Sequence, residues 1–389
     1  IMSILEGFSG FALLALALFS AGATANAIRP FRQTLLLLPS MLWSWFVLGM
    51  MGHTIVLQMI LAAALVALGA LETPLGWVSG AILVLSWLAG SSVIVASRGA
   101  GAVVDVALED AHIRRTSDRV AAWRKVVGFP FRGRSVEKVR GIPFRRVAGM
   151  TLKLDVYTDG SETTGRPILV YIHGGGWVIG DKREQGLPLI HHLARSGWVC
   201  FSVNYRLSPI AGWPDQLVDV KYALTWIRSH AHEYGADPSF VAVAGGSAGG
   251  HLAALVGLTA NQARYQPGFE GADTSVQVAA PIYGITDVTN RLGVQNEQFV
   301  PLLMEPLVIK AYLEDEPDKF AAASPIDQVH AGAPPFVISQ GDRDTLAPVE
   351  EARAFVEALR ATSDQRVLYL EFPAAQHIFD LGYSNQCGE

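Results

Sequence analysis

The sequence predicts an open, mostly parallel α/β sheet with flanking helices, preceded by a helical region of membrane character. Three observations lead to this prediction. The first 97 residues contain only four charged side chains, whereas the rest of the chain has the charge density of an ordinary globular domain. Beyond residue 138, short apolar runs alternate with segments of helical periodicity. Runs that are apolar on both faces are typical of strands in a parallel sheet covered by helices.

The apolar region, residues 1–97, contains four windows close to the roughly 20 residues that a helix needs to cross a bilayer. These windows are residues 8–28, 35–51, 54–71 and 77–96. We therefore expect three to four spans and a multi-pass protein of the cell membrane. The first window could instead be a signal peptide, because Ala25-Asn26-Ala27 resembles a cleavage site. No Lys or Arg precedes that window, which favours a retained span.

The residues after the apolar region are strongly basic. Residues 98–146 contain twelve Lys or Arg against five Asp or Glu, a local net charge of +7. Next to a membrane, this charge favours contact with anionic lipid headgroups over binding to nucleic acid. A solvated amphipathic connector or cap helix is an equally good interpretation, and we assign it to residues 98–137. The membrane side stays open, because four spans put Arg29 and Arg32 opposite Arg98 and the positive-inside rule then conflicts with itself.

The third region, residues 138–389, is predicted to form one α/β domain. Its expected strands cover residues 151–158, 167–173, 198–205, 240–246, 335–342 and 366–372. Its expected helices cover residues 214–234, 248–259 and 350–361. A segment from about residue 285 to 333 interrupts the alternation of strands and helices with acidic and Pro-containing sequence. We interpret this interruption as a cap inserted over the carboxyl edge of the sheet, where ligands bind in such folds.

The strongest local motif is Gly245-Gly246-Ser247-Ala248-Gly249, which follows an expected strand and precedes an expected helix. It fits the pattern G-x-S-x-G, in which a cramped turn projects the serine oxygen above the N-terminus of the helix. The pattern alone is common by chance. Here its strand-turn-helix context is the one that a serine nucleophile requires, so Ser247 is the candidate nucleophile.

A second motif, Gly174-Gly175-Gly176, follows the expected strand at residues 167–173. A serine that attacks a carbonyl creates an oxyanion, which backbone N–H groups stabilise, and glycine lets the backbone approach without a Cβ atom in the way. We therefore assign the N–H groups of Gly175, Gly176 and Ala248 to an oxyanion hole. A tight turn without a ligand is the plain alternative. A phosphate-binding loop is a poorer one, because the required Lys and Ser or Thr are missing.

A serine hydroxyl needs a neighbouring base, and the base needs a carboxylate that fixes its orientation. On a sheet of this kind the chain order is Ser, then acid, then His. Of the three histidines after Ser247, only His377 follows a late strand, at residues 366–372, whereas His251 lies on the next helix and His330 in the inserted segment. We therefore assign His377 as the base.

The acid is expected in the loop after the strand at residues 335–342. Asp342 and Asp344 both lie there, and their spacing from the strand leaves both open.

Together these residues resemble the hormone-sensitive-lipase-like branch of the α/β-hydrolase superfamily, over roughly residues 138–380. The motifs that recur in the family's order are His173-Gly174-Gly175-Gly176-Trp177, Tyr205-Arg206-Leu207, Gly245 to Gly250, Gly341-x-x-Asp344-x-Leu346 and His377. The resemblance implies an α/β-hydrolase fold, and its D-x-L pattern selects Asp344 as the acid. With apolar spans ahead of the hydrolase region, the chain is most similar to membrane-associated actinobacterial esterases.

The sequence also departs from the family pattern. The turn that carries Ser247 has Gly246 where Asp is commoner in the family. Only twelve residues follow His377, fewer than the family's closing helix needs. We therefore expect the C-terminal end to be truncated or divergent.

The resemblance and the ordered site together predict a membrane-anchored serine carboxylesterase or lipase acting on short- to medium-chain acyl esters. Ser247, Asp344 and His377 would form its triad, with no metal and no organic cofactor. The expected partners are a small-molecule or lipid ester and membrane lipids, with no nucleic acid, and the oligomeric state stays open. The alternatives are an arylformamidase-like amidase or an acyltransferase with the same triad, and a ligand-binding relative without catalysis.

Overall fold

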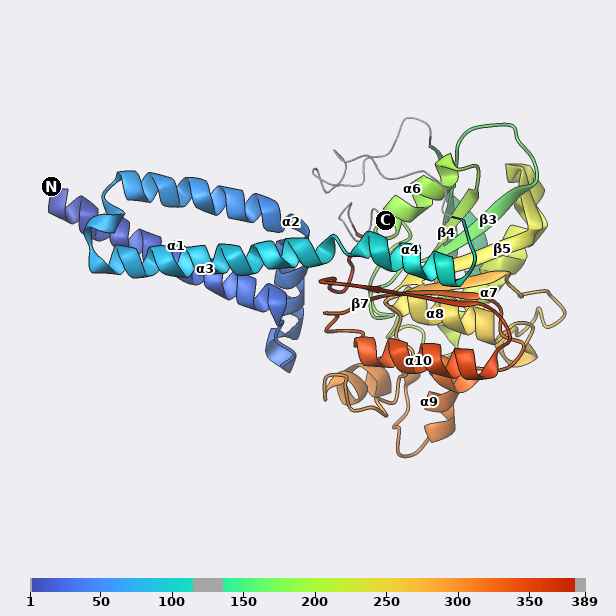
Figure 1. Ribbon diagram of the computed structural model, residues 1–389. Coiled ribbons are helices and arrows are strands. Elements are labelled where there is room, and N and C mark those ends of the chain that lie inside the picture. The colour runs from blue at the N-terminus through green and yellow to red at the C-terminus, as the bar shows by residue number, and fades with distance from the viewer. Residues whose placement is uncertain (1, 115–135, 382–389) are drawn as a thin grey trace.

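The computed structural model describes residues 2–114 and 136–381, in which an elongated bundle of three long helices projects from an α/β domain (Figure 1). Residues 115–135, which hold most of the predicted basic connector, lie outside the described residues. The same is true of residues 382–389, at the end that we expected to be divergent or truncated.

The bundle consists of α1 (Met2–Ile28), α2 (Thr34–Ala67) and α3 (Pro74–Ser97), with a short 3₁₀ turn, η1 (Ala70–Glu72), between the last two. Hydrogen bonds between polar side chains join its helices. Gln58 Oε1 of α2 accepts one from Ser20 Oγ of α1 at 2.7 Å and one from Trp87 Nε1 of α3 at 2.9 Å. Polar contacts of this kind hold helices together where both the interior and the surroundings are apolar.

The structure replaces two of the four predicted windows with one helix. Residues 35–51 and most of residues 54–71 lie in α2, which bends at Met50, where φ is −118° and ψ is 16°. Gly49 and Gly52 flank the bend, and glycine is a common site of helix kinks. The expected break is therefore a kink rather than a loop. Three helices are long and apolar enough to cross a membrane, Gly7–Ile28, Leu35–Ala67 and Pro74–Asp110, the last running through α3 into α4 (Ala100–Asp110).

One eight-stranded sheet forms the centre of the α/β domain, in the order β1-β2-β4-β3-β5-β6-β7-β8. Its strands are β1 (Glu137–Val147), β2 (Met150–Thr158), β3 (Arg166–Ile172), β4 (Val199–Val203), β5 (Ala236–Gly246), β6 (Val278–Ile282), β7 (Phe336–Gly341) and β8 (Val367–Phe372). The pairs β1–β2 and β2–β4 are antiparallel, and every pairing from β4 to β8 is parallel. The predicted fold class is confirmed, and the carboxyl ends of β5, β7 and β8 meet at one edge.

Two strands were absent from the sequence prediction. β1 is an edge strand in which charged residues interrupt the apolar ones, and it carries two register shifts against β2. β6 has only five residues, Val278–Ile282, and contains Pro281. β1 lacks the continuous apolar run by which the central strands were recognised, whereas the apolar run of β6 is short and contains a proline, which argues against a central strand.

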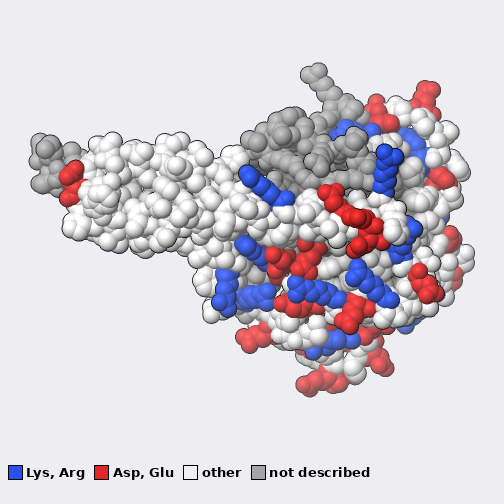
Figure 2. All heavy atoms as spheres, in the orientation of Figure 1, with Lys and Arg blue, Asp and Glu red and all other residues white. Residues whose placement is uncertain are grey.

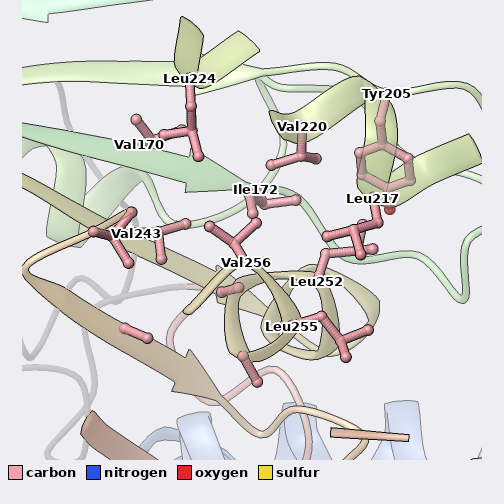
Figure 3. Packing of buried hydrophobic residues seen from close by; sticks show 14 of the residues in the cluster. Val170, Ile172, Tyr205, Leu217, Val220, Leu224, Val243, Leu252, Leu255 and Val256 are labelled. Atoms are coloured by element: carbon pink, nitrogen blue, oxygen red, sulfur yellow. The ribbon is translucent and has the colours of Figure 1, made fainter. Parts of the chain in front are cut away.

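Helices cover both faces of the sheet. Figure 3 shows Val170 and Ile172 of β3 packed with residues of α7 (Asp215–His230) and α8 (Ala248–Leu258). The alternate residues of β3 face the other way and pack against α6 (Leu187–Arg195). α10 (Val349–Thr362) joins the first face through Phe355. The predicted helices at residues 214–234, 248–259 and 350–361 are thus confirmed, the first ending in a 3₁₀ turn, η2 (Ala231–Tyr234).

The inserted segment, residues 285–333, contains the π-helical η4 (Phe299–Ile309), α9 (Pro317–Ala323) and the 3₁₀ turn η5 (Pro325–Gln328). A further 3₁₀ turn, η3 (Ala263–Tyr265), follows α8. The segment contacts the elbow helix, because the imidazole Nε2 of His251 lies 2.7 Å from the carbonyl oxygen of Ala323. Its interpretation as a cap stays a prediction.

The helical bundle packs against the loops that follow β7 and β8. Ala374, in the loop after β8, is buried among apolar side chains of all three bundle helices, including Ala27, Val47 and Val93. α4 continues this contact, since Ala100 belongs to the same buried cluster as residues of β8 and of the loop beyond it. The apolar bundle and the carboxyl edge of the sheet are therefore in direct contact.

Candidate active site

Ser247 lies on the turn between β5 and α8, at the carboxyl edge of the sheet. Its φ of 56° is a left-handed value that non-glycine residues rarely adopt, and it is the strained geometry that a nucleophile elbow requires. The Ser247 N–H donates a hydrogen bond to the carbonyl of Ile282 at 3.0 Å, which fixes the turn to the end of β6. The side chain is half-buried at the N-terminus of α8.

The structure brings Ser247, His377 and Asp344 together in one chain of hydrogen bonds. His377 Nε2 lies 2.9 Å from Ser247 Oγ, and His377 Nδ1 lies 2.7 Å from Asp344 Oδ2. His377 and Asp344 are both buried, in the loops after β8 and β7. A neutral imidazole in this arrangement holds its proton on Nδ1 and can take the serine proton at Nε2.

Two kinds of donor hold the Asp344 carboxylate in place. The Asp344 Oδ1 atom accepts hydrogen bonds from the backbone N–H groups of Leu346 at 2.9 Å and Ala347 at 2.8 Å. The Oδ2 atom accepts one from Gln340 Nε2 at 3.2 Å in addition to its contact with His377. Asp342, the other candidate acid, forms no hydrogen bond with His377 in the described part of the chain, and its backbone N–H donates to the carbonyl of Phe372 in β8 at 3.1 Å.

Gln376 links the acid loop to the histidine loop. Its Oε1 atom accepts the N–H of Thr345 at 3.0 Å and the N–H of His377 at 2.9 Å. These two residues follow Asp344 and Gln376 directly in the chain, so one buried amide sets the spacing between the acid and the base. Gln376 and Gln340 are not recognisable from the sequence, because nothing in their local sequence distinguishes them from ordinary core glutamines.

The glycine loop passes close to the elbow. A Cβ atom on Gly174 would lie 3.0 Å from Ser247 Cβ and 2.7 Å from the carbonyl oxygen of Gly246, so only glycine allows this approach. The Gly174 N–H is occupied, because it donates to Gln185 Oε1 at 2.7 Å. Gly175 and Gly176 have φ values of 114° and 59°, and within the described part of the chain neither N–H donates a hydrogen bond.

Tyr205 and Arg206 brace the glycine loop from the next strand. The Tyr205 hydroxyl donates to the carbonyl of His173 at 3.1 Å, and its ring stacks on the His173 ring with centroids 4.5 Å apart. Arg206 forms a bidentate ion pair with Asp219 of α7, in which Nε lies 2.7 Å from Oδ2 and Nη2 lies 3.1 Å from Oδ1. This pair fixes the turn on which Tyr205 sits.

The other histidines have structural partners. His251 is fully buried, receives a hydrogen bond from Trp177 Nε1 at 3.3 Å and contacts the Ala323 carbonyl. Burial lowers the pKa of His251 to about 4, so this ring is neutral at pH 7. His330 contacts the carbonyl of Leu258 at 3.1 Å. His377 stays the predicted base.

The departure at Gly246 has a steric reason. A Cβ atom on Gly246 would lie 2.7 Å from the hydroxyl oxygen of Tyr283, which is fully buried behind the elbow. The Tyr283 hydroxyl donates a hydrogen bond to Asp380, and its ring lies 4.7 Å from the ring of His377. Burial raises the pKa of Asp380 above the usual range for aspartate. A buried Tyr283–Asp380 pair thus occupies the space next to the elbow that a larger residue 246 would need.

No cluster of three or more His, Cys, Asp or Glu side chains is arranged to hold a metal ion within residues 2–114 and 136–381. The prediction of a site without metal or cofactor stays a prediction.

Comparisons with known proteins agree on one family of enzymes. The sequence profile of the BD-FAE family matches residues 154–359. The chain is 37% identical to the probable carboxylic ester hydrolase LipM of Mycobacterium tuberculosis, covering 95% of this chain and 88% of the relative. It is 46% identical to the esterase LipQ of the same organism over 59% of this chain, an alignment that spans about half (54%) of LipQ.

Solved structures give the same result for the α/β domain. A thermophilic esterase of Thermogutta terrifontis is 26% identical to this chain, with a TM-score of 0.53. The match covers 64% of this chain and 84% of the esterase. A truncated carbohydrate esterase from gut microbiota, 23% identical, matches at the level of the fold, with a TM-score of 0.53 over 63% of this chain and 90% of the other.

Proposed function

This chain belongs to the BD-FAE family of α/β hydrolases and is a carboxylic ester hydrolase, and from this premise we propose that Ser247, His377 and Asp344 are its catalytic triad. The observation that carries the proposal is the continuous hydrogen-bond chain from Asp344 through His377 to Ser247, at 2.7 and 2.9 Å. The three residues come from three separate loops, and no packing requirement explains why their polar atoms should line up in this order.

The proposed reaction proceeds in two steps. Ser247 Oγ attacks the ester carbonyl carbon while His377 Nε2 takes the hydroxyl proton, and the same proton then passes to the departing alcohol as the C–O bond breaks. A water molecule attacks the resulting acyl-serine, giving its proton to His377, which returns it to Ser247 as the carboxylic acid leaves. Asp344 stabilises the imidazolium in both steps without taking the proton itself.

We assign the backbone N–H groups of Gly175, Gly176 and Ala248 to the oxyanion hole. The N–H groups of Gly175 and Gly176 donate no other hydrogen bond among the described residues, and Ala248 is the first residue of α8, where N–H groups lack helical acceptors. An oxyanion at this place would also lie at the positive end of the α8 dipole. Removing one such donor in related chemistry lowers kcat by about 10²–10³-fold.

The proposed substrates are esters with short- to medium-chain acyl groups. The Thermogutta terrifontis esterase has been solved with propionate and with butyrate bound, and the site of the present chain shares the fold that holds them. Turnover of a series of p-nitrophenyl esters, from acetate to dodecanoate, tests acyl length directly.

We expect Ser247→Ala to lower kcat/KM by at least about a thousandfold for every ester, and residual turnover near the wild-type level would reject the triad. Matched anilides test the amidase alternative.

We also propose that the bundle anchors the enzyme in the cell membrane, with residues 98–137 as a connector and 138–389 as the catalytic domain. Three spans, rather than four, put Arg29, Arg32 and Arg98 at the same end of the bundle, next to the catalytic domain. The connection at residues 68–73, at the other end, contains Glu72 and no Lys or Arg. The positive-inside rule then places the catalytic domain in the cytoplasm.

A fusion experiment tests this orientation. Green fluorescent protein joined to the C-terminus should fluoresce, and alkaline phosphatase at the same place should be inactive, since each reporter matures on one side of the membrane only. The opposite pair of results would reverse the assignment.

A further inference from the structure

An open cavity of about 860 Å³ lies where the bundle contacts the catalytic domain. Three parts of the chain line it: the α1–α2 connection at residues 28–33, the inserted segment at residues 294–297, and the acid loop at Asp342, Arg343 and Thr345. Two of the walls are tied together, since Asn296 Nδ2 donates to the carbonyl of Arg32 at 2.7 Å. The cavity is thus a built feature of the junction, and it is separate from the triad itself.

The charged side chains that line this cavity give it a net charge of +1. Arg29, Arg32 and Arg343 line it, against Glu297 and Asp342. Within the described residues none of the three guanidinium groups forms an ion pair with a carboxylate, and Arg343 donates instead to the backbone carbonyl of Ala27 at 3.0 Å. Figure 2 shows Lys and Arg side chains, with Asp and Glu beside them, where the largely uncharged bundle meets the catalytic domain. The cavity therefore has unused donors for an anion, at the level where a bilayer would end.

An apolar surface begins at the edge of this cavity. α2 starts directly after the lining residues 28–33, and the part before its bend at Met50 runs across the domain-side end of the bundle (Figure 1). Large apolar side chains of this part are exposed, among them Leu35 (90%), Leu38 (57%) and Leu42 (50%). Cationic donors next to exposed aliphatic side chains are complementary to a molecule with an anionic head and a hydrocarbon tail.

We propose that this cavity binds the phosphate headgroup of an anionic phospholipid from the adjoining leaflet, with its acyl chains along the first part of α2. Arg29, Arg32 and Arg343 contact the phosphate, and the bilayer supplies the lipid. The proposal rests on the membrane anchoring proposed above. It also gives the lipid a position next to the acid, because Arg343 and Thr345 flank Asp344 in the chain.

Native mass spectrometry of the full chain in detergent tests the proposal, with dioleoyl phosphatidylglycerol and dioleoyl phosphatidylcholine as probes. We expect the wild type to bind phosphatidylglycerol more tightly. Arg29→Gln and Arg32→Gln should each weaken phosphatidylglycerol binding by about fivefold, and the double variant should lose most of the preference. Arg264→Gln, at an exposed arginine of η3 that lies outside both the cavity lining and the basic segment of residues 98–146, is the matched control and should bind like the wild type.

Several outcomes would overturn the proposal. These are equal binding of the two lipids by the wild type, an unchanged preference in the double variant, or the same loss in Arg264→Gln. Displacement of the lipid by millimolar inorganic phosphate alone would also contradict it, because the site would then select free phosphate rather than a lipid. Ester turnover and flotation with vesicles, measured on the same preparations, separate these outcomes from a failure of the proposed catalysis or anchoring.

Discussion

Arg343 and Ala27 join the two halves of the molecule: the guanidinium Nη1 of Arg343, one residue before Asp344, donates a hydrogen bond of 3.0 Å to the Ala27 carbonyl near the end of α1. Ala374, three residues before His377, is buried among the bundle helices nearby. The loop of the proposed acid and the loop of the proposed base therefore both contact helices that are apolar enough to cross a membrane. The bundle is therefore in direct contact with the two loops that hold the proposed acid and base.

This relationship predicts that Arg343→Met lowers both stability and activity. A hydrogen bond from a charged group contributes about 1.5–3 kcal/mol, so we expect a lower Tm in detergent and a several-fold lower kcat, with KM changed less. Arg343→Lys should restore part of the loss. The matched control is Arg353→Met, which removes an exposed pair with Glu371 and should change stability by less than about 1 kcal/mol. Equal effects of the two Met variants would argue against a special role for the junction.

Gln376 provides a test of triad spacing. Gln376→Ala removes the acceptor of the Thr345 and His377 N–H groups, and two such bonds contribute about 1–2 kcal/mol together. We expect kcat to fall by about ten- to thirtyfold with KM nearly unchanged, because the change affects the alignment of acid and base rather than substrate binding. Steady-state kinetics with a p-nitrophenyl ester measures both constants. A variant in which only KM changes would show that Gln376 belongs to the binding surface.

Substitutions at Gly246 and Tyr283 should have coupled effects on stability. Gly246→Asp places a side chain against the Tyr283 hydroxyl, and overpacking of this kind destabilises by about 1–3 kcal/mol. Gly271→Asp, at a position with open space around it, is the matched control and should be close to neutral. In a Tyr283→Ala background the cost of Gly246→Asp should shrink. Thermal melts of the four combinations form a double-mutant cycle, and strict additivity would contradict the contact.

The raised pKa of Glu351 should make the stability of the folded protein depend on pH. Burial, followed by the nearby Asp287, raises the pKa of Glu351 from 4.5 to about 8 in the folded protein. Between these values the folded chain holds a proton that the unfolded chain has lost, so this group's contribution to stability is complete below about pH 4.5 and is lost as the pH rises through about 8. Glu351→Gln should flatten the decline of Tm between pH 5 and 9. The exposed Glu357→Gln should keep the wild-type slope, and an equally steep decline in Glu351→Gln would assign the effect to another group.

The sequence was most informative where one local rule decides the structure. Continuous apolar runs located the central strands, the G-x-S-x-G pattern between a strand and a helix located the turn at Ser247, and chain order selected the loop of His377. The bend of α2 could not be predicted, because the sequence pattern of one apolar helix with glycines around Met50 is the same as that of two separate spans. The edge strand β1 and the short β6 owe their pairing to their neighbours in the sheet. Gln340, Gln376 and Tyr283 act through contacts between distant segments, for which a single sequence carries no local signal.

The central claim is that Ser247 is a nucleophile activated by His377, and a fluorophosphonate probe tests it most directly. The related Thermogutta terrifontis esterase has been solved phosphonylated by sarin, so phosphorus reagents of this class react with a member of the fold. Detergent-solubilised protein should be labelled, mass spectrometry should map the label to the peptide containing Ser247, and His377→Ala should abolish labelling while leaving the thermal melt intact. Labelling at another residue, or none in a folded sample, would contradict the account.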